Sequence, residues 1–209
     1  MPDDPAHPAI QRVLDAAARK GVTLEVTQFE ESTHTAAEAA AALGAELAQI
    51  VKSLVFVVAA EGGPEPLLCL VSGPNRVDLA RLAAVAGETD VRRATAREAH
   101  ELTGFSIGGI PPIGHTRPVR AIMDPDLGRY PTVWAAAGLP TAVFPVAPGT
   151  LRMLANATVA PITEERSLAD RASSEAADRA PGRAPDGETN GGTDHAPNGS
   201  ALATHDARS

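Results

Sequence analysis

Apolar residues recur at helical spacing in several parts of the chain. In the first part, Ile10, Val13, Leu14 and Ala17 share one face of a segment that ends at Gly21. Two later segments begin with the pattern Thr-x-x-Glu, in which the hydroxyl and the carboxylate bind free amides of the first turn. The spacing predicts helices over residues 8–20, 35–43, 78–87, 95–102 and 148–155.

Apolar runs of a different kind predict strands between these helices. Residues 51–58 are rich in β-branched side chains and apolar on both faces, as is typical of a central strand. Residues 67–71 follow a Gly-Gly-Pro turn, so the two runs are expected to form a hairpin. Shorter strands are expected over residues 23–29, 91–94, 119–123, 132–136 and 141–146.

The composition changes sharply near residue 169. Residues 171–209 contain one large aliphatic residue, Leu202, among Ala, Ser, Gly, Pro, Asp and Arg. Such a segment cannot bury enough apolar surface to offset the entropy of the chain. We therefore expect one folded domain over residues 8–165, a flexible N-terminus over residues 1–7 and a disordered tail over residues 170–209.

Charge restricts the partners of this domain. The 209 residues carry a net charge of −8 and a pI near 5.2, which argues against a protein that coats nucleic acid through a general positive field. Arginines on both sides of a glycine-rich segment would still guide a polynucleotide end if they shared one face; pairing with neighbouring acids is the alternative. These are Arg76, Arg81, Arg92, Arg93, Arg97, Arg117, Arg120 and Arg129.

Cysteine content and apolar runs indicate the compartment. Cys69 is the only cysteine, which excludes a disulfide framework or a cysteine metal site within one chain. No set of His, Cys, Asp and Glu has metal-ligand spacing, so we predict no metal. The first residues lack the pattern of a secretory signal, and no apolar run approaches the roughly 20 residues that span a bilayer. We expect a soluble cytoplasmic protein without membrane contact.

The stretch from Gly104 to Met123 is the strongest candidate for a working loop. Its glycines and prolines are Gly104, Gly108, Gly109, Pro111, Pro112, Gly114 and Pro118. Glycines let a ligand approach the main chain, and paired prolines stiffen a loop. The stretch is therefore either a cradle of free amides for an anion or oxyanion, or a tight connection between strands.

Lys52 is the most informative single residue. The chain has 18 Lys and Arg residues, but only Lys20 and Lys52 are lysines. A compact ammonium at the start of the most buried strand suits a phosphate or a developing oxyanion better than a forked guanidinium does. The alternative is a strand-end lysine whose ammonium reaches water.

Histidines and an aspartate near the loops supply further candidates. His115 and His34 would each donate to a substrate carbonyl, position a water, or cap a main-chain carbonyl. Asp124 closes the strand over 119–123 and would either cap the next turn or project beside the loop. No Gly-x-Ser-x-Gly elbow, Ser–His–acid order, Gly-x-Gly-x-x-Gly loop or Walker-type loop occurs, which argues against a nucleophilic triad and a nucleotide cofactor.

Several of these motifs, in this order, resemble the YbaK family of aminoacyl-tRNA editing domains. The family includes free-standing deacylases of mischarged prolyl-tRNA and the editing insertion of bacterial prolyl-tRNA synthetases. The matching motifs are Thr35-Ala36 opening a helix that ends Leu43-Gly44, then Gln49-Ile50-Val51-Lys52-Ser53-Leu54, then Gly108-Gly109-Ile110-Pro111-Pro112-Ile113-Gly114, then Asp124, then Ala137-Gly138. They fall within residues 8–160.

The resemblance implies a single α+β domain with a mixed, strongly curved, barrel-like sheet flanked by helices. It also implies a pocket at one end for the aminoacyl ester on the terminal adenosine of tRNA. The residues implied to act in catalysis are Lys52, Gly108, Gly109 and Asp124; those implied to bind substrate are Thr35, Ser53, Ile110, Pro111, Pro112, Gly114 and His115. The ester is already activated, so loop amides and a positioned attacker would suffice, without metal, cofactor or nucleophilic side chain.

The implied function is a trans-editing aminoacyl-tRNA deacylase that acts on a mischarged prolyl-tRNA or on a small amino acid such as Ala, Ser, Thr or Cys. Its implied partners are the aminoacylated 3′ end of tRNA and an aminoacyl-tRNA synthetase or elongation factor, with no DNA. The form Pro111-Pro112-Ile113-Gly114-His115 differs from the cysteine-specific and alanine-specific members, which leaves the amino acid open. The alternatives are a non-catalytic binding module for a tRNA end, a nucleotide or a protein, and a hydrolase of another small activated ester.

Overall fold

The computed structural model describes residues 7–29, 35–60 and 62–165. The tail predicted over residues 170–209, most of the N-terminus predicted over residues 1–7, and His34 lie outside the described residues. His7 is described, and it caps the first helix because its Nδ1 accepts a hydrogen bond from the main-chain N–H of Ala9.

The helices confirm the segments expected from the sequence. They are α1 Pro8–Ala18, α2 Ala36–Leu43, α3 Leu79–Ala86, α4 Ala96–Thr103 and α5 Pro148–Ala155, with short 3₁₀ helices η1 Leu47–Gln49 and η2 Pro125–Arg129. Both Thr-x-x-Glu patterns form complete capping boxes, one at Thr35 and one at Thr95. In the described ranges no helix is long and apolar enough to cross a membrane.

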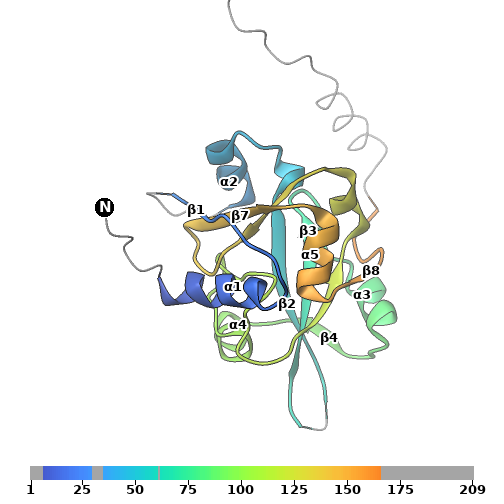
Figure 1. The fold of residues 1–209 in the computed structure, drawn as a ribbon. Helices are drawn as coiled ribbons and strands as arrows, with labels where there is room; N and C mark the ends of the chain where they lie inside the picture. The colour runs from blue at the N-terminus through green and yellow to red at the C-terminus, as the bar shows by residue number, and fades with distance from the viewer. Residues whose placement is uncertain (1–6, 30–34, 61, 166–209) are drawn as a thin grey trace, which may run out of the picture. The chain divides into compact units, whose positions relative to one another are not determined.

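A mixed five-stranded sheet forms the centre of the domain. Its order is β4 (Val91–Arg93), β2 (Val51–Val58), β3 (Glu65–Ser72), β5 (Arg120–Met123) and β8 (Thr158–Val159). The expected hairpin is present, since β2 and β3 pair antiparallel from Val51 opposite Ser72 to Val58 opposite Glu65. β5 then runs parallel to β3, and β8 parallel to β5. Figure 1 shows β2 and β3 side by side in the middle of the fold.

A second, antiparallel sheet contains β1 (Thr27–Gln28), β7 (Ala142–Val146) and β6 (Val133–Ala136). The strand expected over residues 23–29 is wrong in extent, because only Thr27 and Gln28 pair with β7. Leu24 and Val26 nevertheless pack against the core. The alternation that predicted a strand therefore reflects burial of alternate side chains without strand pairing.

The barrel-like sheet implied by the resemblance is not confirmed, because neither sheet closes within the described residues. The two sheets meet at an isolated bridge between Ile50, just before β2, and Trp134 of β6. β4 covers the same edge of β2 only between Val55 and Val58. At the Val55 end, the carbonyl of Val55 accepts a hydrogen bond from the N–H of Ala94 at 3.0 Å. The β2 edge between Ile50 and Val55 thus has no partner strand in the part that the structure describes.

The five-stranded sheet is buried on both faces. On one face, Val51, Val55 and Val57 belong to a large core shared with α1, α4, α5 and the second sheet. On the other face, Phe56 packs in a smaller cluster with Leu82 of α3. In Figure 1, α3 accordingly lies on the opposite side of β2 and β3 from α1 and α4. This burial confirms the prediction that residues 51–58 form a central strand.

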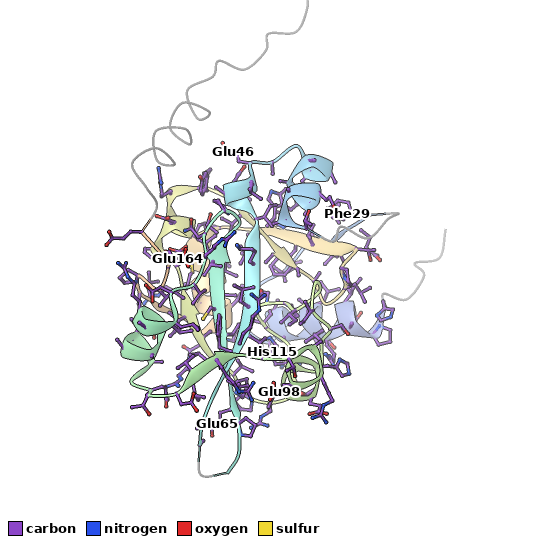
Figure 2. All side chains as sticks on the ribbon, turned by 180° about the vertical axis from the view of Figure 1, so that it is seen from behind. Phe29, Glu46, Glu65, Glu98, His115 and Glu164 are labelled. Carbon is purple, nitrogen blue, oxygen red and sulfur yellow. The ribbon has the colours of Figure 1, made fainter. Side chains whose placement is uncertain are left out.

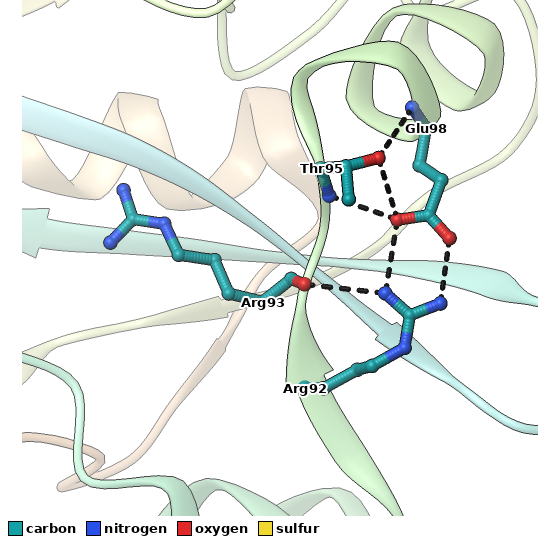
Figure 3. Close-up of polar contacts among 4 residues, drawn as sticks. All are labelled: Arg92, Arg93, Thr95 and Glu98. Atoms are coloured by element: carbon teal, nitrogen blue, oxygen red, sulfur yellow. Dashed lines mark hydrogen bonds and ion pairs between the residues drawn. The ribbon is translucent and has the colours of Figure 1, made fainter.

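A charged network fixes the start of α4 against β4 (Figure 3). The Glu98 carboxylate accepts hydrogen bonds from Arg92 Nη2 at 2.6 Å and Nη1 at 3.0 Å, and from the N–H of Thr95 at 2.9 Å. The pKa of Glu98 is held well below its usual value, first by Arg92 and then by Thr95. A carboxylate with a lowered folded-state pKa stabilises the fold above its unfolded pKa, and this contribution is lost as the pH falls.

We expect Glu98→Gln to lower the melting temperature at pH 7 more than Glu101→Gln does. Glu101 is a matched control because it lies on the same helix and forms an ion pair with Arg97 at the surface. The Arg97 side chain is 82% exposed and the Glu101 side chain 57%. The difference in melting temperature between the wild type and Glu98→Gln should shrink as the pH falls below about 4.3, the usual pKa of a glutamate. Below that pH the ionised Glu98 contributes progressively less to the stability of the wild type. Thermal unfolding followed by circular dichroism between pH 7 and pH 2.5 measures both effects. An equal deficit for the two variants at pH 7 would contradict this assignment.

Candidate functional site

A cavity of about 220 Å³ lies where the two sheets fail to join. One wall is the unpaired edge of β2, from Val51 to Leu54, and the loop from Ile107 to Ile110 closes the cavity from the side. The start of α2, and the hairpin between β6 and β7, complete the lining. The site therefore depends on the gap that distinguishes this fold from a closed barrel.

The structure brings five of the residues implied by the resemblance to this cavity. They are Thr35, Lys52, Ser53, Gly108 and Ile110. The other six are absent from the cavity lining: Gly109, Pro111, Pro112, Gly114, His115 and Asp124. The remaining wall is largely apolar and was not expected from the sequence, because Trp134, Leu139 and Pro140 reach the cavity only through the folding of the second sheet.

Main-chain groups on the open edge of β2 face the cavity. Along a strand the N–H and C=O groups of alternate residues point to the same side. The carbonyl of Val55 points toward β4, where it accepts from Ala94, so the N–H and C=O of Ser53 point to the same, unpaired side. The Ser53 hydroxyl is also buried without a hydrogen-bond partner among the described residues. Ser53 thus offers polar groups to a ligand.

Lys52 belongs to a chain of polar contacts at the end of the sheet. Its Nζ donates a short hydrogen bond to the main-chain carbonyl of Asn75. The Asn75 side-chain Nδ2 donates to Asp124 Oδ2 at 2.6 Å and to Asp126 Oδ2 at 2.9 Å. Asp124 therefore lies behind Lys52, with Asn75 between them. Asn75 is not among the residues predicted from the sequence, because the segment Ser72-Gly73-Pro74-Asn75 carries only the signals of a turn.

Burial and charge act on these groups in opposite directions. Burial, and then the charges of Arg76 and Arg93, lower the pKa of Lys52, while the nearby carboxylate of Asp124 raises it. Burial raises the pKa of Asp124, which is 1% exposed, and the hydrogen bond from Asn75 lowers it. The lysine is therefore easier to deprotonate than a surface lysine. It suits both electrostatic stabilisation and proton transfer.

Two amides of the glycine loop are free to bind a ligand, but they differ from the expected pair. The N–H of Gly109 donates to the carbonyl of Ser106 at 3.0 Å. Among the described residues, the N–H groups of Gly108 and Ile110 have no hydrogen-bond partner, and both residues line the cavity. Gly108 has φ +96°, a conformation that favours glycine. The candidate oxyanion donors are thus the amides of residues 108 and 110.

Gly109 shapes the cavity by close packing. A Cβ at this position would lie 2.6–2.9 Å from main-chain atoms of Leu139, so only glycine permits this approach. Leu139 lines the cavity from the β6–β7 hairpin. The glycine pair therefore has two different tasks: Gly108 turns the chain at the cavity, and Gly109 lets the hairpin close over it.

His115 supports the loop from behind. Its Nε2 lies 2.9 Å from the carbonyl of Pro111, and its ring meets Phe105 edge to face. Arg12 covers the Phe105 ring, with its guanidinium carbon 4.0 Å from the centroid. Figure 2 labels His115 far from Glu46, which lies near the start of β2. Of the alternatives drawn from the sequence, these contacts favour the residue that caps a main-chain carbonyl.

The described residues offer no activated nucleophile at the cavity. Burial raises the pKa of the Cys69 thiol to about 12, and the side chain is fully buried in β3. Ser53 Oγ makes no hydrogen bond to a histidine or an acid in the described ranges. The arrangement is suited to binding and polarising a reactive carbonyl. Among the described residues, no side chain at the cavity is activated to attack that carbonyl.

The arginines divide between the two alternatives. Arg81, Arg92, Arg97 and Arg120 form ion pairs with glutamates, as ordinary surface residues do. The other four arginines singled out from the sequence have no ion-pair partner in the part that the structure describes: Arg76, Arg93, Arg117 and Arg129. Of these four, Arg76 and Arg93 act electrostatically on Lys52. Two arginines without a salt bridge among the described residues therefore act on the lysine of the cavity, in a protein that is acidic as a whole.

Comparisons with known proteins agree with this geometry. A sequence model of the aminoacyl-tRNA editing domain matches residues 30–154. The crystal structure of a proposed trans-editing enzyme for prolyl-tRNA synthetase is 48% identical with a TM-score of 0.70, covering 76% of this chain and 99% of that one.

Two curated relatives are similar over most of their length. The proposed Cys-tRNA(Pro)/Cys-tRNA(Cys) deacylase EbsC of Enterococcus faecalis is 29% identical, over 62% of this chain and 78% of its own. The multifunctional Ser/Thr-tRNA deacylase ProXp-y of Escherichia coli is 29% identical, over 62% of this chain and 77% of its own. The matched residues 30–154 contain α2, the open edge of β2, the glycine loop and the strands from β2 to β7. The chain belongs to the family of aminoacyl-tRNA editing domains.

Proposed function

We propose that this protein is a trans-editing deacylase that hydrolyses the ester between a small amino acid and the 3′ end of tRNA. The observation that carries the proposal is the cavity at the open edge of β2, where Lys52, the Ser53 main chain and the free amides of Gly108 and Ile110 lie around one space. The volume of about 220 Å³ suits a small aminoacyl group. EbsC and ProXp-y are named for tRNAs carrying Cys, Ser or Thr, which supports a substrate of this size.

The polar groups suggest how the ester binds. The α-ammonium of the substrate lies against the carbonyl and hydroxyl of Ser53. The ester carbonyl oxygen faces the amides of Gly108 and Ile110, which stabilise the oxyanion when an attacker adds to the carbonyl carbon. The amino-acid side chain packs against the apolar wall at Trp134. This placement uses the carbonyl and hydroxyl of Ser53 and both free loop amides.

Hydrolysis needs an attacker and a proton for the leaving group. A water, or a hydroxyl of the tRNA, adds to the carbonyl carbon and loses its proton to solvent; the bond to the ribose oxygen then breaks, and that oxygen takes a proton. Lys52 supplies positive charge at the ribose, and its lowered pKa allows its ammonium to donate that proton. In the hydroxyl route, water then hydrolyses the transferred ester. No side-chain nucleophile takes part.

Arg76 and Arg93, which have no ion-pair partner among the described residues, support binding of the tRNA end. Phosphates of single-stranded nucleic acid bind to Lys and Arg side chains with loss of condensed counterions. Arg76 follows Asn75, which holds the Lys52 ammonium, and Arg93 lines a small hollow that shares Ser53 and Ile110 with the main cavity. We place the last phosphates of the acceptor strand against these two arginines.

Lys52→Ala should lower kcat for deacylation by about 100-fold, because the charge at the leaving ribose is lost. Hydrolysis of tRNAs charged with Ala, Ser, Thr, Cys and Pro measures the effect, and the wild type should turn over a subset of them. Arg97→Ala, which removes an exposed cation from α4, is the control and should leave the rate unchanged. Unchanged hydrolysis by Lys52→Ala would refute the role of Lys52. Binding without turnover across the panel would instead indicate a non-catalytic module.

Replacing Arg76 and Arg93 together by alanine should raise KM for aminoacyl-tRNA by roughly tenfold at low salt and flatten the salt dependence of KM. The kcat value should change less than KM, since neither guanidinium reaches the reacting ester and the two charges act on the reaction only through the pKa of Lys52. The double variant Arg19→Ala/Arg97→Ala removes the same charge outside the cavity lining and serves as the control. The same rise in KM for both double variants would show that only net charge matters.

A further inference from the structure

Asn75 lies at the junction between the buried acids and the candidate catalytic lysine. It follows the end of β3, is 3% exposed, and closes the turn through its N–H bond to Ser72 at 2.9 Å. Resting on the function proposed above, we propose that Asn75 is the positioning residue of this site. It holds the Lys52 ammonium with its main-chain carbonyl, and its side-chain amide anchors it to Asp124 and Asp126.

The side-chain contacts fix Asn75 in one orientation. Its Nδ2 donates to Asp124 Oδ2 at 2.6 Å and to Asp126 Oδ2 at 2.9 Å. If the amide were rotated by 180°, Oδ1 would face two carboxylates, and neither of them can donate a hydrogen bond to it. Asp124 is itself fixed at the end of β5, where it accepts from the N–H of Asp126 at 3.1 Å. The anchor therefore extends into the parallel β3–β5 pair.

The orphaned oxygen of the amide argues for a role beyond the turn. Asn75 Oδ1 is buried and has no hydrogen-bond partner among the described residues. A buried acceptor without a hydrogen bond lowers the free energy of unfolding, so an amide is a costly choice at a position that only has to end a strand. The two donated bonds to the carboxylates explain why an amide stands here: they hold the Asn75 carbonyl in place for the ammonium.

The arrangement gives Asp124 an indirect part in the reaction. Asp124 is absent from the cavity lining, and its charge acts on Lys52 across Asn75. The other charges that act on Lys52 are those of Arg76 and Arg93, both of which disfavour the ammonium. Asp124 is thus the carboxylate that offsets the two arginines, and Asn75 sets where the ammonium points. Both are positioning residues because neither reaches the cavity.

Enzyme kinetics test this in the full chain. Asn75→Ala should lower kcat by about tenfold to 100-fold with little change in KM, since misplacement of a catalytic group affects the reaction more than binding. Asp124→Asn should shift the alkaline limb of the pH profile to lower pH, because the charge that favours the Lys52 ammonium is gone. The double variant should lose less than the product of the single losses. Asp78→Asn, at the cap of α3, is the matched control and should leave the kinetics unchanged.

A spectroscopic test reads the lysine directly and does not depend on activity. Lys20 and Lys52 are the only lysines, so a protein labelled at lysine ¹³Cε and ¹⁵Nζ gives two NMR signals, and Lys20 is an internal control. Lys20 Nζ binds the carbonyls of Met153 and Leu154, away from this network. We expect Asp124→Asn to lower the titration midpoint of Lys52 and Asn75→Ala to speed exchange of its Nζ protons, with Lys20 unchanged in both.

The outcomes separate this proposal from the function on which it rests. A folded Asn75→Ala variant with unchanged kcat and an unchanged Lys52 signal overturns the positioning role, whatever the wild type hydrolyses. A wild type that hydrolyses none of the charged tRNAs overturns the proposed function, and the NMR signals alone then decide whether Asn75 holds Lys52. If Asn75→Ala fails to fold, Asp124→Asn carries the test through its pH profile and the Lys52 titration.

Discussion

The two edges of β2 determine where this domain works. One edge is paired with β3 along its whole length, in a register that places Val51 opposite Ser72. The other edge is covered at its ends, by the Ile50–Trp134 bridge and by β4, and is open between them within the described residues. An open strand edge buried in a protein presents polar groups that need a partner. Here that partner is the proposed substrate.

The same register assembles the catalytic side of the cavity. Because β2 and β3 pair antiparallel, Lys52 near the start of β2 lies beside the residues that follow β3. Because β3 and β5 run parallel, with Leu70 opposite Met123, Asp124 reaches the same end of the sheet. Asn75 connects the two through its main chain and its side chain. Strand pairing thus brings three residues distant in sequence to one end of the sheet, where the hydrogen bonds of Asn75 join them.

The sequence predicted local structure better than it predicted the arrangement of the sheets. Helix limits followed from capping boxes and glycines, and the central strand followed from its apolar run, because these signals lie within a few residues. The gap beside β2 and the apolar wall at Trp134 depend on pairing between distant segments, which no local pattern records. Asn75 was missed for the same reason: its partners, Lys52, Asp124 and Asp126, are contacts of the fold.

Binding of the aminoacyl end of tRNA at the open edge of β2 would be seen in a crystal structure with a non-hydrolysable 3′-alanylamino-3′-deoxyadenosine. We expect the acyl group to occupy the cavity, with its carbonyl oxygen on the amides of Gly108 and Ile110 and its ammonium on the Ser53 carbonyl. An analogue that binds away from this cavity, or with its carbonyl turned from both amides, would show that the open edge is not the substrate site.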